Sequence, residues 1–351
     1  MYEPRPPAPH RRRTVVPVVR APTIAVRGFV SVRFLDGDGR TPILVDAIDR
    51  HGEIRRVHEL AERPNLFTNG GMDALHDTAQ SLLRATLRVG TGTAPPAFGD
   101  TTLEAEAQNG TTVGTATGPG TTTTEEVWTN RNNLARRIVM TADRNLTEFG
   151  FGTPSVLSVR NLFRDEFGDP VTVSLLTDKI IEVVHRLETD FPRYGLGSAL
   201  DWQERDAANN VTSTTTVDIN AGFAAHSTQS MEPILIRGSA FTVGVYGSGL
   251  APSTAAPANA IHLGGAPGRV ADPYVTGSYQ WETSGGTLPV TTGNQTWFGG
   301  FMGVRNHSNN RWRGGLGYFF QDPVTDDPVG FPKLSTHTLT LPTLRISWAR
   351  A

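Results

Sequence analysis

The alternation of apolar and polar residues predicts that this chain folds mainly as β-structure. In residues 180–187 four alternate positions share one predicted face: Ile181, Val183, His185 and Leu187. Similar runs occupy residues 134–141, 146–151, 156–163 and 171–175. Further short apolar runs follow beyond residue 190, ending with residues 338–348. We expect many short strands, and we interpret His185 as a hydrogen-bonded histidine within a sheet rather than a ligand.

One segment has the spacing of a helix. Met72, Leu75 and Ala79 recur at helical intervals, and Asn69 is placed to cap the first turn. From residue 83 the period changes, because apolar residues alternate with Arg and Thr through residue 89. This pattern predicts a short helix that leads into a strand with one buried face.

A turn signature separates the first two alternating runs. Asp36-Gly37-Asp38-Gly39 lies between them and predicts a β-hairpin. The aspartate spacing is similar to that of a calcium loop, but no glutamate stands at the twelfth position, where an EF-hand needs one. We therefore interpret Asp36 and Asp38 as turn residues.

The expected architecture is two tandem β-sandwich-like modules with one short helix and long exposed loops. Residues 1–27 are predicted to be an extended basic arm, residues 28–190 the N-terminal β module and residues 191–351 the C-terminal β module. The boundary is placed where residues 188–212 interrupt the alternation. Residues 108–126 are rich in Gly and Thr and predict a long exposed loop.

The N-terminal arm combines prolines with arginines, while the whole chain has a formal net charge of −2. Arg11, Arg12 and Arg13 are the candidate interface residues, and we expect the arm to dock across a neighbouring subunit. Contact with DNA is the alternative, which the balanced charge of the remaining chain disfavours. No apolar run approaches the ~18 residues needed to span a bilayer, so no membrane contact is expected.

The sequence contains little that points to catalysis. It has no cysteine, and only two of its 32 basic residues are lysines, neither of which follows a glycine as a P-loop requires. Gly90-Thr91-Gly92 lacks the third glycine of a dinucleotide fingerprint. His58 begins a zincin-like segment without the second histidine, and no G-x-S-x-G elbow is present. We expect no catalytic residue, no cofactor and no metal, and hence no enzyme.

Two sets of side chains leave alternatives open. The acid pairs Asp165/Glu166 and Asp326/Asp327 stand in turn-like surroundings and are interpreted as solvated, although a close carboxylate pair could cleave a glycoside. Three tryptophans occur among small residues in the C-terminal half: Trp281, Trp297 and Trp312. They are predicted to fill a core or a subunit interface, with a sugar-stacking surface as the alternative.

Several motifs together resemble a domain of virion structural proteins of tailed bacteriophages, found in tail, tail-fibre and collar components. The matching pieces in residues 65–190 are TNGG at residues 68–71, VGTGTAPP at 89–96, DTTLEAE at 100–106 and LTEFGFG at 146–152. The ending LRISWARA is similar to the terminal strands of such proteins. The basic arm and the 108–126 segment are not part of the pattern.

The resemblance implies a non-enzymatic virion protein that acts through symmetric oligomeric assembly with itself and other virion proteins, in the tail, collar or head–tail region. A host receptor (glycan)-binding fibre protein, a capsid-decorating protein and a glycan depolymerase remain alternatives. Five motif residues are expected to form a structural turn: Gly90, Gly92, Pro95, Pro96 and Asp100. The glycines allow close approach, the prolines stiffen the exit from the strand, and Asp100 caps the turn that returns Leu103 to the core.

Overall fold

The computed structural model describes most of the first half of the chain and selected strands of the second half. The described residues are 19–20, 23–75, 83–115, 120–123, 127–192, 195–205, 211–225, 241–246, 274–283, 287–288, 295–297, 299–305, 312–325, 331–333, 339–340 and 344–351. Arg11, Arg12 and Arg13 of the predicted arm lie outside them.

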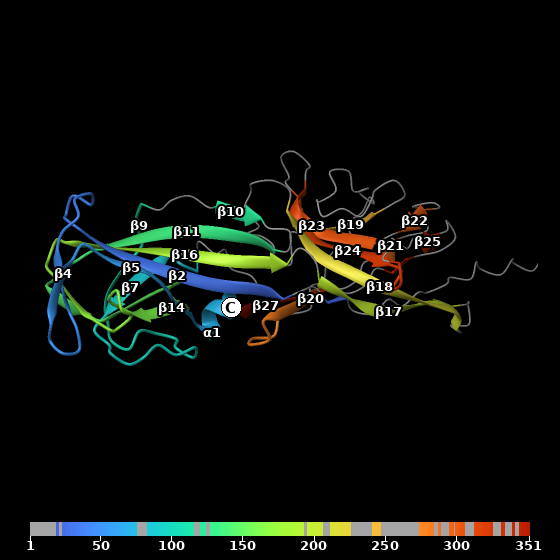
Figure 1. Ribbon diagram of the computed structural model, residues 1–351. Coiled ribbons are helices and arrows are strands. Elements are labelled where there is room, and N and C mark those ends of the chain that lie inside the picture. The colour runs from blue at the N-terminus through green and yellow to red at the C-terminus, as the bar shows by residue number, and fades with distance from the viewer. Residues whose placement is uncertain are drawn as a thin grey trace, which may run out of the picture.

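The described part confirms a mainly β fold with one short helix, and its largest sheet has nine strands. Six strands follow one another in this order: β1 (Val19–Arg20), β27 (Leu344–Arg350), β2 (Ile24–Leu35), β16 (Ile180–Pro192), β11 (Val127–Val139) and β10 (Gly120–Thr123). Three more join it at the sides: β20 (Gln280–Thr283) on β27, β5 (Glu59–Pro64) on β2 and β9 (Thr112–Val113) on β11. Figure 1 shows β2, β16 and β11 side by side along the first part of the molecule.

Two smaller sheets complete the first part of the molecule. A four-stranded sheet has the order β12 (Arg144–Leu146), β15 (Thr172–Leu175), β3 (Val45–Ile48), β4 (Ile54–Val57). A five-stranded sheet has the order β6 (Leu66–Phe67), β14 (Leu157–Leu162), β13 (Glu148–Gly152), β7 (Thr86–Gly90), β8 (Glu106–Gly110). Apolar side chains from all three sheets form one buried cluster, because alternate residues of each strand face inward.

A separate sheet forms most of the described second part (Figure 1). Its five strands have the order β17 (Gly195–Arg205), β18 (Val211–Ala225), β24 (Trp312–Gln321), β23 (Gly299–Arg305), β19 (Phe241–Tyr246). Two strand pairs accompany it: β21 (Thr287–Leu288) with β26 (Leu339–Thr340), and β22 (Gln295–Trp297) with β25 (Phe331–Lys333).

The single described helix, α1, spans Asn69–Ala74. Its N-cap is Thr68, whose hydroxyl accepts a hydrogen bond from the Gly71 amide at 3.1 Å. The prediction that Asn69 caps the helix was therefore wrong by one residue, because the Thr68 backbone is still extended while Asn69 is already helical. Of the predicted helical positions, Met72 and Leu75 are buried, whereas Ala79 lies outside the described residues.

The path of the chain differs from a simple tandem arrangement. β2 begins at Ile24, inside the segment assigned to the arm. The last strand, β27, returns to the first part, where Ile346 and Trp348 join its core. β27 is held there because it pairs in parallel with β1 and β2 and antiparallel with β20.

Three local predictions need correction. Residues 108–126 are not one loop, because β8, β9 and β10 pair there with β7 and β11, as β-branched threonines allow. The described residues within 188–212 belong to β16, β17 and β18, and the pairing of β17 with β18 contains bulges. After the turn at Asp36, the chain makes only one bridge back to β2, from Pro42 to Leu35, before β3 joins β15 and β4.

The outward face of the large sheet carries rows of charged side chains in register. Glu182 on β16 lies opposite Arg137 on β11 and Arg33 on β2, with ion pairs of 2.6 and 3.5 Å. Six residues further along β16, Glu188 is flanked in the same way by Arg131 and Arg27 at 2.8 and 3.5 Å. These rows link the three long strands on the face that is turned away from the core.

Candidate functional site

The glycine–proline motif lies over a buried ion pair on the outer face of the five-stranded sheet. Glu148 on β13 stands opposite Leu162 on β14, and Arg160 stands opposite Gly150, so the two charged side chains are diagonal neighbours on one face. The exposed fraction of Glu148 is 0% and that of Arg160 is 3%. Phe149 and Phe151 point to the opposite face and into the core.

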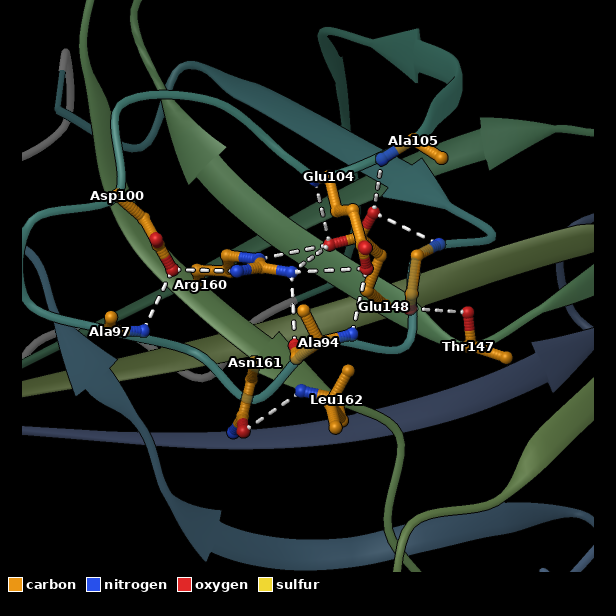
Figure 2. Close-up of polar contacts among 11 residues, drawn as sticks. Ala94, Ala97, Asp100, Glu104, Ala105, Thr147, Glu148, Arg160, Asn161 and Leu162 are labelled. Carbon is orange, nitrogen blue, oxygen red and sulfur yellow. Dashed lines mark hydrogen bonds and ion pairs between the residues drawn. The ribbon is translucent and has the colours of Figure 1, made fainter.

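Both oxygens of the Glu148 carboxylate are bound. Oε1 accepts the backbone amides of Gly92 at 3.1 Å and Ala105 at 2.8 Å, while Oε2 accepts the amide of Glu104 at 3.2 Å. Oε2 also accepts Nε of Arg160 at 2.9 Å. One buried side chain on β13 therefore holds both ends of the loop at residues 91–105 (Figure 2).

Arg160 binds the same loop from β14. Its Nη1 donates to Oδ2 of Asp100 at 2.7 Å, and its Nη2 donates to the carbonyl of Ala94 at 3.1 Å. Burial works to lower the pKa of Arg160, but the Asp100 and Glu148 carboxylates outweigh it, so the pKa is raised. Burial likewise opposes ionisation of Asp100, yet the Ala97 amide and Arg160 hold the pKa of this carboxyl below its ordinary value. Asp100 and Arg160 are thus both charged at neutral pH.

The ion pair leaves no room for a side chain at either motif glycine, Gly90 or Gly92. Gly90 lies directly opposite Glu148 in the β7–β13 ladder, and a Cβ there would stand 2.5 Å from the Ala105 carbonyl and 2.7 Å from Glu148 Oε1. A Cβ on Gly92 would overlap both the Glu148 carboxylate and the side chain of Glu104. Close approach, rather than positive φ, therefore explains both glycines.

The middle of the motif remains at the surface. Ala94, Pro95, Ala97 and Phe98 are exposed, and the exposed fraction of Phe98 is 52%. Asp100 accepts the Ala97 amide at 2.8 Å and so closes the turn, after which Leu103 is buried at 4% exposure. Of the five predicted turn residues, Gly90 ends β7, and Gly92, Pro95, Pro96 and Asp100 lie in the loop that follows, where Asp100 closes the turn.

A second cluster fixes the C-terminal strand to α1. The indole Nε1 of Trp348 donates to the Met72 carbonyl at 2.9 Å, and its ring stacks on Tyr274 at a centroid distance of 5.8 Å. The Tyr274 hydroxyl donates to Asp73 at 2.6 Å, and burial followed by this hydrogen bond raises the pKa of Tyr274. The TNGG segment and the SWAR ending, distant in sequence, are thus direct neighbours.

Arg350 connects this anchor to the glycine–proline loop. Its guanidinium lies over the ring of Phe98 at 4.3 Å and over the ring of Tyr279 at 5.6 Å. It also donates to the Phe67 carbonyl at 2.8 Å and to Asn69 Oδ1 at 2.6 Å. The Phe98 carbonyl accepts the amide of Asn69 at 2.7 Å. The two clusters therefore form one continuous region.

His185 lies in the core, as a bonded histidine rather than a ligand. Arg84 Nη1 donates to its Nδ1 at 3.1 Å, and the side-chain amide of Asn65 lies 3.1 Å from its Nε2. Because an arginine only donates, Nδ1 is the acceptor, and the proton of the neutral ring is on Nε2. Burial and then the Arg84 charge hold the pKa of His185 well below its usual 6.5.

The other predicted residues lie on separate elements or outside the described residues. Trp281, Trp297 and Trp312 lie on β20, β22 and β24, which belong to three different sheets. The Asp165 carboxylate accepts the amides of Phe167 and Asp169 and so closes a turn. Glu166 pairs with Arg55 at 2.6 Å, and Asp326 and Asp327 lie outside the described residues.

Sequence reasoning missed the two residues that organise the motif, Glu148 and Arg160. Each is a charged residue inside an otherwise apolar run, LTEFGFG and SVRNLF. A charge within a buried strand requires a partner, and this signal could have paired them. Their joint contact with a distant loop depends on strand pairing, which the pattern of one strand does not contain.

Among the described residues no group of three or more His, Cys, Asp and Glu side chains is placed to bind a metal ion. No helix in the described ranges is long and apolar enough to cross a membrane. In comparisons with known proteins, no family model matches the chain, and no curated protein and no solved structure is significantly similar to it. The protein is thus mainly β. In its two clusters, Glu148 holds the glycine–proline loop and Trp348 holds the C-terminal strand against α1.

Proposed function

We propose that this protein is a non-enzymatic structural component of a tailed-phage virion, located in the tail, collar or head–tail region and acting through oligomeric assembly. The observation that carries the proposal is the meeting of the motif segments that resemble those proteins. The TNGG helix start, the GTGTAPP loop, Glu148 of LTEFGFG and the SWAR ending contact one another through the two clusters around Glu148 and Trp348.

The chemistry of this region also supports a structural role. The Glu148 carboxylate accepts hydrogen bonds on both oxygens, and Arg160 is paired with Glu148 and Asp100. A general acid or base must exchange protons with a substrate, so it needs an accessible and suitably tuned group. Saturated, buried charges instead hold a loop in one conformation, which suits a protein that presents fixed surfaces to its neighbours.

The test is mass spectrometry and electron cryomicroscopy of purified virions. We expect the protein at a copy number that fits one symmetric ring or trimer in the tail, collar or head–tail region. Absence of the protein from purified particles would contradict the proposal. If the protein were found on the capsid surface, the proposal of a structural virion protein would stand, but the proposed tail, collar or head–tail location would be wrong.

The same particles separate the alternatives. For a receptor-binding fibre protein, changing Trp297 or Trp312 abolishes adsorption to host cells while virions still assemble. For a depolymerase, the purified protein degrades host polysaccharide. For the proposed assembly role, variants that disturb the loop reduce particle yield, and neither of the other two effects is observed.

A further inference from the structure

The glycine–proline loop presents an exposed apolar surface, and the buried side chains of Glu148 and Arg160 fix its backbone. Ala94, Pro95, Ala97 and Phe98 are exposed, and no residue between 91 and 99 is charged. Directly beneath them lie Glu148 and Arg160, both buried. Burying an ion pair costs desolvation energy that an apolar pair would avoid, so its benefit is a defined loop conformation rather than stability.

The surface continues onto the C-terminal anchor. Phe98, Arg350 and Tyr279 form a stack in which the guanidinium contacts both rings. We call the loop residues 94–98 together with Tyr279 and Arg350 the ledge. Val275, at 68% exposure, lies on the same short segment as Tyr279. A rigid surface of proline and aromatic rings is the kind that binds extended, proline-rich segments.

Acidic side chains border the ledge on its loop side. Glu104 accepts the Ala94 amide at 2.7 Å, and its side chain is 45% exposed. Asp100, which closes the turn after Phe98, is 21% exposed and is already paired with Arg160. The more exposed carboxylate of Glu104 therefore favours an occupant that carries positive charge beside its prolines.

Residues 1–18 of this chain have that composition. Four prolines lie between residues 4 and 9, and Arg5, Arg11, Arg12 and Arg13 stand against Glu3 alone. These residues precede the first described strand, and eighteen extended residues span up to about 60 Å. We propose that the ledge binds residues 1–18 of a second copy of this chain.

The first described residues of the chain and the ledge lie at opposite ends of β27. Val19 and Arg20 pair in parallel with Leu344 and Arg345, and the chain then runs along β27 toward Arg350. Val19, the first described residue, therefore lies at the Leu344 end of β27, whereas the ledge lies at the Arg350 end, ~20 Å away. A second copy that brings its Val19 end to this ledge makes a head-to-tail contact, which can close into a ring.

The experiment uses the full chain with a photo-crosslinking residue, p-benzoylphenylalanine, in place of Phe98. Protein labelled with a heavy nitrogen isotope is mixed with unlabelled protein, dissociated, reassociated and irradiated, and crosslinked peptides are identified by mass spectrometry. We expect crosslinks from position 98 of one copy to residues 1–18 of the other. Crosslinks confined to one copy, crosslinks to any other segment, or no crosslink would each overturn the proposal.

A matched pair of substitutions gives a second readout. Phe98→Ser should weaken self-association by at least about tenfold in analytical ultracentrifugation, because it removes the central ring of the ledge. Val113→Ser, at a residue 69% exposed on β9 and outside the ledge, should leave it unchanged. Equal effects of both substitutions, or none, would refute the role of the ledge. The inference concerns the purified chain, so it stands or fails separately from the virion proposal.

Discussion

At the scale of single residues, the motif glycines are set by what stands opposite them. Gly92 faces the Glu148 carboxylate and the Glu104 side chain, with no room for a Cβ. Gly99, in the same loop, has nothing within 4 Å of the position where a Cβ would be. The two glycines look alike in the sequence and have different physical reasons for being there.

Gly92→Ala should destabilise the protein by about 1–3 kcal/mol, because the methyl group must displace part of the ion-pair cluster. Gly99→Ala should change the free energy of unfolding by less than about 1 kcal/mol. Urea unfolding followed by tryptophan fluorescence measures both. Equal losses would mean that the space around Glu148 does not determine the loop.

Glu148→Gln should cost about 3–5 kcal/mol, because it leaves the buried Arg160 guanidinium without its central partner. The control is Asp46→Asn, which removes an exposed ion pair with Arg56 and should cost less than about 1 kcal/mol. The comparison is again made by urea unfolding. A small loss in both variants would show that the loop does not depend on this carboxylate.

His185 makes stability depend on pH. Its pKa is lowered in the folded protein, so below pH 6.5 the unfolded chain binds a proton that the folded chain does not. The free energy of unfolding should therefore fall as the pH drops from 6.5 to about 5, by up to about 1.4 kcal/mol per pH unit. His185→Gln should flatten this slope. An unchanged slope in the variant would assign the dependence to other groups.

At the scale of elements, alternation predicted several strands well and their partners poorly. β16 agrees with the predicted run at residues 180–187, because one face of it is buried against the core. The Gly/Thr segment that becomes β8, β9 and β10 has no apolar face to reveal it. Its strands form because neighbouring edges of β7 and β11 accept them, which is information that lies elsewhere in the chain.

The short strand β27 is expected to contribute strongly to the free energy of unfolding. Trp348→Ala should destabilise the protein by about 3–5 kcal/mol, because the ring is 2% exposed and its Nε1 is bonded to Met72. Ala349→Ser, at the neighbouring exposed position, should be nearly neutral. Thermal unfolding by circular dichroism compares them. A small loss of stability in Trp348→Ala would mean that the core does not depend on β27.

At the scale of the whole molecule, the mainly β class followed from the sequence, whereas the closure of the first core by the end of the chain did not. Nothing in LRISWAR says which sheet it joins, because a strand with one apolar face fits many edges. The candidate site could not be predicted for the same reason, because strand patterns do not say which strands pair. Its motifs were visible separately, but their contacts join residues up to 283 positions apart, such as Arg350 and Phe67.

A fragment that ends at residue 192 should therefore fail to fold cooperatively, although it contains every strand of the two smaller sheets in the first part. It lacks Ile346 and Trp348 in the core and the β27 pairing with β2. Amide proton dispersion in NMR spectra and the urea transition report this directly. A sharp transition at the midpoint of the full chain would contradict the expected dependence.

The late position of β27 has a consequence during synthesis. A ribosome makes Ile24 early and Trp348 only after 323 further residues, yet the two lie in register in adjacent strands. Folding domains normally form as they emerge, N-terminal part first. Here the first core cannot close until Trp348 has been made, so a copy whose synthesis stops before that point lacks Trp348, Arg350 and the stack that completes the ledge. Such a truncated product is expected to remain without its native fold.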